Sequence, residues 1–362
     1  MASVPDKIYD EFLKDQIDLL RLSESEKLKA EELLLLMRQD ILKKIVEFDP
    51  LTLDRSDYQL RKMQKMNVVI AQIVVDNYEK FAAANKLTLE ALAAYEAKNT
   101  MKIYNKVVGA NVIDIGLSEN KLRSIINNSM IDGQLIGDWW KNQAKEFITK
   151  FESTMKTIVK DFQIGIGENQ SFSQMVSAIS PNGELMGLTK ANIDALVHTS
   201  ILSVGDGVRK AIVKENESIF SGEKWVSTLD RRTSEICRAL DGNIWDMEHN
   251  NIKGGMNYRR PPAHWRCRSV MIGITKSFEE ILGEKPIVKK LSNKQRASMN
   301  GPVSADMDYG TWLKTLPEKE QVEILGKTRY NLFIKGNLSM ADMVKQNGNP
   351  LTIKELQKKV ER

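Results

Sequence analysis

Residues 228–242 read TLDRRTSEICRALDG, and residues 261–269 read PPAHWRCRS. Both cysteines of the 362-residue chain, Cys237 and Cys267, fall in these two strings, and His264 stands three positions before Cys267. Two of the six tryptophans, Trp245 and Trp265, lie in the same segment. Because these rare residue types are concentrated in one short segment, we expect it to fold into a specific local unit.

The two strings resemble the signature of the phage head morphogenesis family, the Mu F-like minor head proteins. That signature is similar to T-x-D-x-R-T-C-x-x-C-x-x-L-D-G followed by P-P-x-H-x-x-C-R-C, and a fixed pattern of this length is far more specific than one short motif. Ser234 and Ser269 stand where the family usually has cysteine. The motif positions that this chain keeps, and that the resemblance marks as structural, are Asp230, Arg232, Thr233, Cys237, Asp241, Gly242, Pro261, Pro262, His264 and Cys267.

The resemblance covers residues 120–362, because the C-terminal sequence is also similar to that of the family. It implies a minor head protein of a tailed phage that is associated with the portal inside the capsid and is not an enzyme. The implied partners are the portal protein and other capsid or internal head proteins, with packaged double-stranded DNA as a further contact. Such a protein is made in the host cytoplasm, ends in the virion, and aids DNA packaging or ejection.

The composition favours a chain that folds in a reducing cytosol. Charged residues make up 28% of the chain and only two residues are cysteine, which argues against a disulfide-built secreted scaffold. The N-terminus MASVPDKIYDEFLKDQ has no basic start followed by an apolar run, so we expect no signal peptide. No apolar stretch approaches the roughly 20 residues that span a bilayer, so we expect no membrane segment. The formal net charge of +5 permits contact with nucleic acid without requiring it.

Hydrophobic periodicity predicts a mainly α protein with one small α+β unit. Apolar residues recur at helical spacing through most of the first 213 residues, whereas residues 224–228 and 269–274 have the composition of strands. The predicted divisions are an N-terminal helical region over 1–116, a helical lead-in over 117–221, the α+β motif unit over 222–275, a basic linker over 276–303 and a helical tail over 304–362.

Capping signals predict several helix boundaries. Ser23-x-x-Glu26 has the pattern of a capping box, so we expect one helix over residues 9–22 and a new one from Ser23 to Phe48. A second capping box, Ser171-x-x-Gln174, predicts a short helix that ends near Ile179. Further helices are expected over residues 55–85, 87–108, 118–131, 139–163 and 188–213.

Positive charge is concentrated between Lys253 and Arg296, where eleven residues are basic and three are acidic. Such a stretch fits either a solvated linker or a surface that faces a polyanion. Only three of its residues are aromatic, and stacking of single strands needs more. We therefore predict sequence-independent contacts with DNA phosphates, with the candidates Lys285, Lys289, Lys290, Lys294 and Arg296.

The cysteine and histidine pattern makes a zinc site one hypothesis. Structural zinc needs four ligands, and Cys237, His264 and Cys267 supply three. Asp230, Asp241 or His249 are candidates for the fourth. Serine is a poor zinc ligand, so Ser234 and Ser269 argue that packing and hydrogen bonds have replaced the metal. We therefore expect no cofactor, with zinc at Cys237, His264 and Cys267 as the alternative.

The same residues also fit a site without metal. We favour Cys237 and Cys267 as buried small hydrophobic residues beside Trp225 or Trp265. A disulfide between them is disfavoured in a reducing cytosol. His264 can instead donate a hydrogen bond to one of two motif carboxylates, and the motif arginines can form ion pairs with those carboxylates. The residues proposed for these roles are Asp230, Asp241, Arg231, Arg232, Arg266 and Arg268.

An enzyme is the alternative function. Cys237 and His264 have the residue types of a thiol hydrolase dyad, or of a metal-dependent hydrolase, but no third orienting residue stands at a recognisable spacing. Gly326-Lys327-Thr328 is similar to the end of a P-loop, but position 321 is Gln where that motif needs Gly. The sequence therefore favours a structural protein over a hydrolase.

Overall fold

A computed structural model describes residues 4–47, 57–163, 176–181, 183–276, 295–304 and 306–361. The fold is mainly helical and contains only small sheets, which confirms the predicted fold class. Contacts divide the chain into two compact units. Unit 1 consists of residues 1–20, 92–125 and 202–362, and unit 2 consists of residues 21–91 and 126–201. Among the helices that these ranges contain, none has the length and apolar character needed to cross a bilayer.

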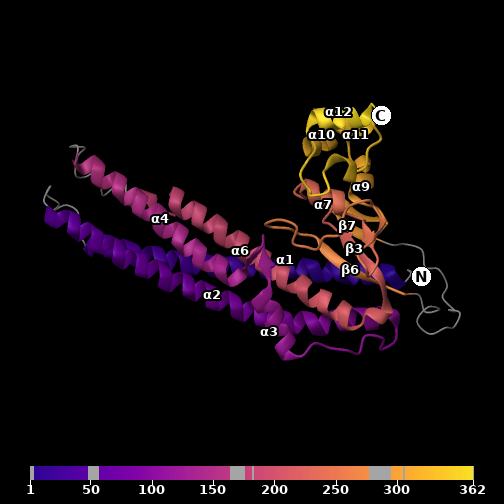
Figure 1. Ribbon diagram of the computed structural model, residues 1–362, viewed down its shortest axis with the longest axis horizontal. Coiled ribbons are helices and arrows are strands. Elements are labelled where there is room, and N and C mark those ends of the chain that lie inside the picture. Colours follow the sequence, from indigo (N-terminus) through magenta and orange to yellow (C-terminus); the bar gives the residue numbers. More distant parts are fainter. Residues whose placement is uncertain are drawn as a thin grey trace. The chain divides into compact units, whose positions relative to one another are not determined.

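Four long helices supply most of the first 215 residues, and Figure 1 labels them α1, α2, α4 and α6. Their bounds are Val4–Glu47, Asp57–Val108, Ile136–Gln163 and Glu184–Glu215. The shorter α3 covers Glu119–Asn128, and the hairpin of β1 (Met130–Ile131) and β2 (Gln134–Leu135) leads into α4. The apolar stripes of these helices form the core of unit 2, where Phe81 on α2 stacks on Trp140 of α4 with ring centroids 6.0 Å apart.

Helix α1 continues through Ser23, so the prediction of a new helix at Ser23 is wrong. The Ser23 side chain is buried, and its Oγ lies 2.9 Å from Nδ1 of His198 on α6. A serine whose hydroxyl has a long-range partner is not free to cap the backbone, and the helix has no other reason to stop there. Helix α2 likewise runs unbroken through residues 85–87. The predicted capping box at Ser171 and Gln174 lies outside the described residues.

The motif unit is built on a four-stranded antiparallel sheet within unit 1 with the order β5-β4-β3-β6. Strand β3 (Phe220–Val226) follows α6, and β4 (Ile244–Trp245), β5 (Asn251–Lys253) and β6 (Val270–Thr275) complete the sheet. The short helix α7 (Glu235–Leu240) connects β3 to β4. The two predicted strands are thus β3 and β6, which pair directly along their length.

The sheet packs on the parts of α1 and α2 that belong to unit 1. Tyr104 of α2 accepts a hydrogen bond at Oη from the main-chain N–H of Gly273 on β6, at 2.9 Å. Its ring contacts Phe12 of α1 and Phe220 of β3, with centroids 5.1 and 5.0 Å away. Burial of these rings joins the sheet to the helices in one apolar core.

The C-terminal segment of unit 1 begins with a hairpin. Strands β7 (Gln295–Ser298) and β8 (Gly301–Ser304) occupy residues that the sequence placed in a linker, and residues 277–294 lie outside the described part of the chain. Four short helices follow, which are α9 (Tyr309–Thr315), α10 (Glu318–Leu325), α11 (Lys327–Lys335) and α12 (Ile353–Val360). They enclose their own apolar cluster, centred on Trp312 and Phe333.

Candidate functional site

The cysteine–histidine cluster forms where α7 meets the loop before β6. Ser234 begins α7 as its N-cap, because its side chain accepts a hydrogen bond from the main-chain N–H of Cys237 at 3.4 Å. This cap points the Cys237 side chain inward. His264 and Cys267 come from the loop that follows the cis bond between Pro261 and Pro262.

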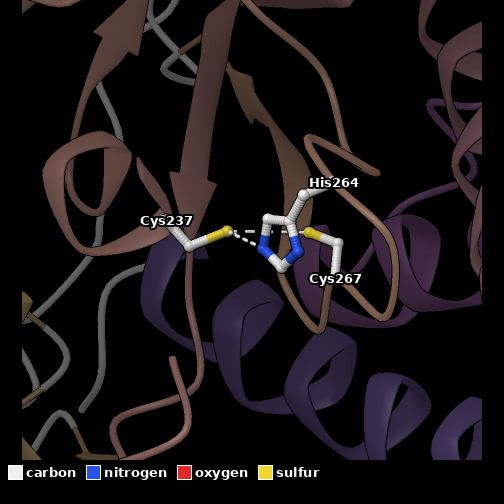
Figure 2. A group of neighbouring side chains, drawn as sticks. All are labelled: Cys237, His264 and Cys267. Atoms are coloured by element: carbon white, nitrogen blue, oxygen red, sulfur yellow. Dashed lines mark hydrogen bonds between the residues drawn. The ribbon is translucent and has the colours of Figure 1, made fainter. Parts of the chain in front are cut away.

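The three predicted side chains meet at one point, as Figure 2 shows. The Sγ atom of Cys237 lies 3.1 Å from Nε2 of His264 and 3.7 Å from Sγ of Cys267. Oγ of Ser234 lies 2.7 Å from the same Nε2. Both cysteines are free thiols, 2% and 0% exposed, in a cluster that includes Trp225. The sequence thus identified the members of this cluster, but Ser234 joins it as a hydrogen-bond partner.

The orientation of the imidazole ring is fixed from its other side. Nδ1 of His264 donates to the carbonyl oxygen of Trp265 at 2.7 Å, because a carbonyl can only accept. In the neutral ring Nε2 is then an acceptor for the hydroxyl of Ser234 or the thiol of Cys237. Burial disfavours the charged ring, but the sulfur of Cys267 and the Trp265 carbonyl outweigh it and raise the pKa of His264.

The two thiols have opposite tendencies to ionise. A hydrogen bond from Cys237 holds the pKa of Cys267 well below its ordinary value, although burial opposes this. The same bond, together with burial, raises the pKa of Cys237 well above its ordinary value. The second sulfur and the imidazole therefore stabilise negative charge on Cys267, and the proton of the pair stays on Cys237.

Neither motif carboxylate contacts His264, so the predicted hydrogen bond from His264 to Asp230 or Asp241 is wrong. Asp230 accepts from Arg268 at 2.7 Å and from the main-chain N–H of Arg232 at 2.9 Å. Asp241 accepts from the guanidinium of Arg296 at 3.0 Å. Each carboxylate is thus occupied by an arginine, which is a stronger partner than a neutral imidazole.

The motif carboxylates hold the unit together through main-chain contacts as well. Asp241 also accepts from the main-chain N–H groups of Ser227 and Tyr309, at 2.6 and 2.7 Å. The main-chain N–H of Thr233 donates to Asp230 at 3.0 Å. Gly242, next to Asp241, has a φ of 79°, a backbone conformation that favours glycine.

Arg296 does not face DNA, which corrects that member of the predicted phosphate contacts. Its side chain is 4% exposed and is enclosed by Asp241, the carbonyl oxygen of Ser227 and the carbonyl oxygen of Met307. A buried arginine paired with a carboxylate does not reach a phosphate at the surface. The other four candidates, Lys285, Lys289, Lys290 and Lys294, lie outside the described residues.

A buried ion triad that the sequence did not reveal anchors the motif loop. Arg260 donates to both oxygens of Asp206 on α6, at 2.8 and 3.0 Å, and also contacts Glu223 on β3. Tyr258 donates from its hydroxyl to the same Glu223 at 2.8 Å. Arg260 stands in the basic stretch, but its charge is neutralised here. No local pattern could have shown this, since its partners are 54 and 37 residues away.

The predicted ion pairs of the motif arginines form only in part. Arg268 pairs with Asp230, but Arg231 pairs with Glu320 and Glu323 of α10, at 3.3 and 2.7 Å. The side chain of Arg232 is exposed. The arginines therefore tie the loop to different neighbours and do not form one continuous lattice.

The cluster has the geometry of three corners of a zinc site. Around a tetrahedral zinc, with Zn–S of about 2.3 Å and Zn–N of about 2.0–2.1 Å, ligand atoms lie roughly 3.5–3.8 Å apart. The distance of 3.7 Å between the two Sγ atoms matches this separation, and the Sγ–Nε2 distance of 3.1 Å is shorter. Cys237, His264 and Cys267 could therefore hold a metal on one side.

A fourth strong ligand is missing from the part of the chain that the structure describes. Of the three predicted candidates, Asp230 and Asp241 are held by arginines, and His249 stacks on Tyr258 with ring centroids 3.7 Å apart. The hydroxyl of Ser234 takes the remaining side of the imidazole. Three residues fit zinc, but the four-ligand set of a structural site is incomplete.

Comparison with known proteins agrees with this location of the motif. Residues 120–272, from α3 to β6, match the model of the family described as Phage Mu protein F like protein. No curated protein and no solved structure matches the chain. The matched span contains β3, α7, β4, β5 and all three members of the cluster, and it ends within β6, before the C-terminal helices. Residues 120–272 of the chain are therefore similar to the phage Mu protein F like family.

Proposed function

We propose that the protein is a minor head protein of a tailed phage that lies inside the capsid and binds the portal protein. The family match over residues 120–272 carries this proposal, because it covers both motif strings and all three members of the cysteine–histidine cluster. The long helices α1, α2, α4 and α6 supply extended surfaces suited to contacts with the portal and with other internal head proteins. In this role the protein aids head assembly and the packaging or ejection of DNA.

The burial of the cluster favours a structural role over a thiol or metal-dependent hydrolase. The lowered pKa of Cys267 and the raised pKa of His264 are properties that a nucleophilic pair also has. A nucleophile must reach its substrate, however, and Cys267 is 0% exposed while Cys237 is 2% exposed. Both sulfurs instead lie in an apolar cluster. We therefore assign the polar contacts of this site to holding the loop in place.

The test is the composition of the particle at two stages. We expect mass spectrometry to find the protein in purified procapsids, in few copies relative to the major capsid protein. Chemical cross-linking of procapsids should join its lysines to the portal protein more often than to the outer capsid surface. Absence from procapsids, or cross-links restricted to the outer surface, would contradict the proposal. Comparison with mature and emptied particles then shows whether the protein leaves with the DNA.

A further inference from the structure

A cavity in unit 2 combines apolar walls with buried polar groups that have no partner. The cavity has a volume of about 320 Å³, which is at the lower end of the range for small-ligand sites. It lies between α2, the end of α3 and the first turn of α4. We call it the α2–α4 cavity, and its apolar walls come mainly from Ala82, Ala83, Leu89, Ile126, Leu135 and Trp140.

Two side chains that line the α2–α4 cavity are buried without hydrogen bonds. Asn85 on α2 is 5% exposed, and neither its Oδ1 nor its Nδ2 has a partner among the described residues. Trp140 on α4 is 3% exposed, and its Nε1–H also has no partner within those ranges. Buried polar groups without partners destabilise a protein, so their presence together beside one cavity points to a ligand that supplies the partners.

The hydrogen-bonding groups of Asn85 and Trp140 indicate which polar group the ligand carries. An asparagine side chain offers an NH2 group with two N–H donors and one acceptor oxygen, and an indole offers one donor. A secondary amide, with one N–H and one C=O, complements such a set. The Asn85 amide makes no hydrogen bond in its present orientation. Turning it toward an amide that enters the cavity therefore breaks no existing hydrogen bond.

The rim of the cavity favours negative charge. Gly137 and Asp138, in the first turn of α4, line the cavity together with Lys86 and Lys141. The first N–H groups of a helix have no acceptor within the helix and carry partial positive charge. Lys86 has no ion-pair partner in the described part of the chain. Lys141, in contrast, forms an ion pair with Asp138, with Nζ and Oδ1 3.5 Å apart. A carboxylate placed at this rim would meet the helix N-terminus and Lys86.

We propose that the α2–α4 cavity binds an N-acylated amino acid with an aliphatic side chain and a free carboxylate. The carboxylate meets the first turn of α4 and Lys86, the acyl amide meets Asn85 and Trp140, and the side chain fills the apolar wall. A polypeptide C-terminus that ends in an apolar residue has the same chemistry as a free N-acyl amino acid. The site is independent of the cysteine–histidine cluster and of the proposed role in the phage head.

The first experiment is a titration of the full chain with N-acetyl-leucine, followed by saturation-transfer NMR and by tryptophan fluorescence. We expect saturable binding, and at least ten-fold weaker binding of N-acetyl-leucinamide, which lacks the carboxylate. No saturable binding, or equal binding of the two compounds, would overturn the proposal. A longer peptide that ends in leucine distinguishes the sources, because tighter binding identifies a polypeptide C-terminus and equal binding identifies a free small molecule.

The second experiment uses paired variants of two buried asparagines on α2. Asn85→Leu removes the groups without partners, so we expect loss of N-acetyl-leucine binding together with a higher melting temperature. Asn77→Leu is the matched control, because Asn77 is also buried but donates to the carbonyl oxygen of Ile73 at 2.8 Å and does not line the cavity. It should lower the melting temperature and keep binding. Should Asn85→Leu lower the melting temperature as much as Asn77→Leu, Asn85 is satisfied internally, for example by a buried water, and the site is refuted.

Trp140→Phe gives a third variant. The phenyl ring can still stack on Phe81, and the change removes the Nε1–H donor together with one ring of the buried indole. We expect N-acetyl-leucine to bind several-fold more weakly and, because buried volume is lost, the melting temperature to fall modestly. Unchanged binding in this variant and in Asn85→Leu would place the ligand elsewhere and overturn the assignment.

Discussion

At the scale of single residues, His264 determines the shape of the motif loop through contacts on both ring nitrogens. Its Nδ1 donates to the Trp265 carbonyl, and its Nε2 meets Ser234 and Cys237. His264→Ala leaves these partly buried partners unsatisfied, so we expect a loss of about 1–3 kcal/mol in unfolding free energy. Denaturant unfolding measures this. His249→Asn, at an exposed histidine of the same unit, is the control and should change little. An unchanged midpoint in His264→Ala would show that the ring is dispensable.

The hydroxyl of Ser234 occupies a position from which a thiolate would complete a zinc site. We predict that the purified wild-type protein contains little stoichiometric zinc, because only three strong ligands come together. Ser234→Cys supplies a fourth beside Nε2 of His264 and should raise the zinc content toward one per chain. Elemental analysis of both proteins, purified without chelators, measures the zinc content per chain. One tightly held zinc per wild-type chain would refute this prediction.

The carboxyl group of Glu96 should make stability fall as pH rises. Burial raises the pKa of Glu96 to about 8 from its ordinary value of 4.5, and the nearby Asp15 adds to the effect while Arg209 opposes it. A carboxyl with a raised folded pKa contributes its full stability below the unfolded pKa. That contribution is lost as pH rises from about 4.5 through about 8.

Glu96→Gln tests this pH dependence, since glutamine keeps the size and the neutral state of the protonated acid. One carboxyl contributes at most about 1.4 kcal/mol per pH unit. We expect the unfolding free energy of the wild type to decrease more steeply than that of Glu96→Gln between pH 6 and 8. Parallel curves for the two proteins would show that Glu96 is ionised throughout this range.

At the scale of elements, Arg260 attaches the motif loop to α6 and β3. Replacing Arg260 with methionine leaves Asp206 and Glu223 buried without their cation, so we expect a loss of about 3–5 kcal/mol. Arg259→Met is a matched control one position away. Its guanidinium donates to the carbonyl oxygen of Asn347 at 3.2 Å and neutralises no buried carboxylate in the described part of the chain, so the change should cost under about 0.5 kcal/mol. Thermal unfolding measures the loss of stability in both variants. An equal loss in the two would show that Arg260 does not anchor the motif loop.

Local signals in the sequence located the elements, but not their partners. The β-like residues 224–228 and 269–274 correspond to β3 and β6, and the PPAHWRC string brings His264 and Cys267 to Cys237. Ser23 lies inside α1, and its hydroxyl forms a hydrogen bond with His198, which is 175 residues away. The basic residues around Arg296 in the sequence predict a contact with DNA phosphates. In the structure, Arg296 instead forms an ion pair with Asp241, 55 residues earlier. Spacing and composition predict contacts within a few turns of the chain, and these pairings are beyond that reach.

At the scale of the whole molecule, the remaining DNA candidates predict weak and salt-sensitive binding. Charge reversal of Lys289, Lys290 and Lys294 should abolish a low-salt gel shift, because phosphate contacts depend on released counterions. Two unrelated duplexes should bind equally well. Reversal of the exposed lysines at positions 335, 354 and 358 makes the same change of net charge elsewhere and should retain binding. Absence of binding at low salt, or its survival in the first variant, would reduce the stretch to a solvated linker.

The hydrogen bonds of Asp241 limit where the chain can be truncated without loss of its fold. It receives hydrogen bonds from Ser227 just after β3, from Arg296 on β7 and from the start of α9, yet the last two lie beyond residue 272, where the family match ends. Upstream of residue 120, the ring of Tyr104 packs on Phe220 inside the matched span, with ring centroids 5.0 Å apart. The matched span is therefore smaller than the set of residues that hold it in place. A fragment of residues 120–272 should expose its amides to rapid hydrogen exchange, whereas the full chain protects them as one block.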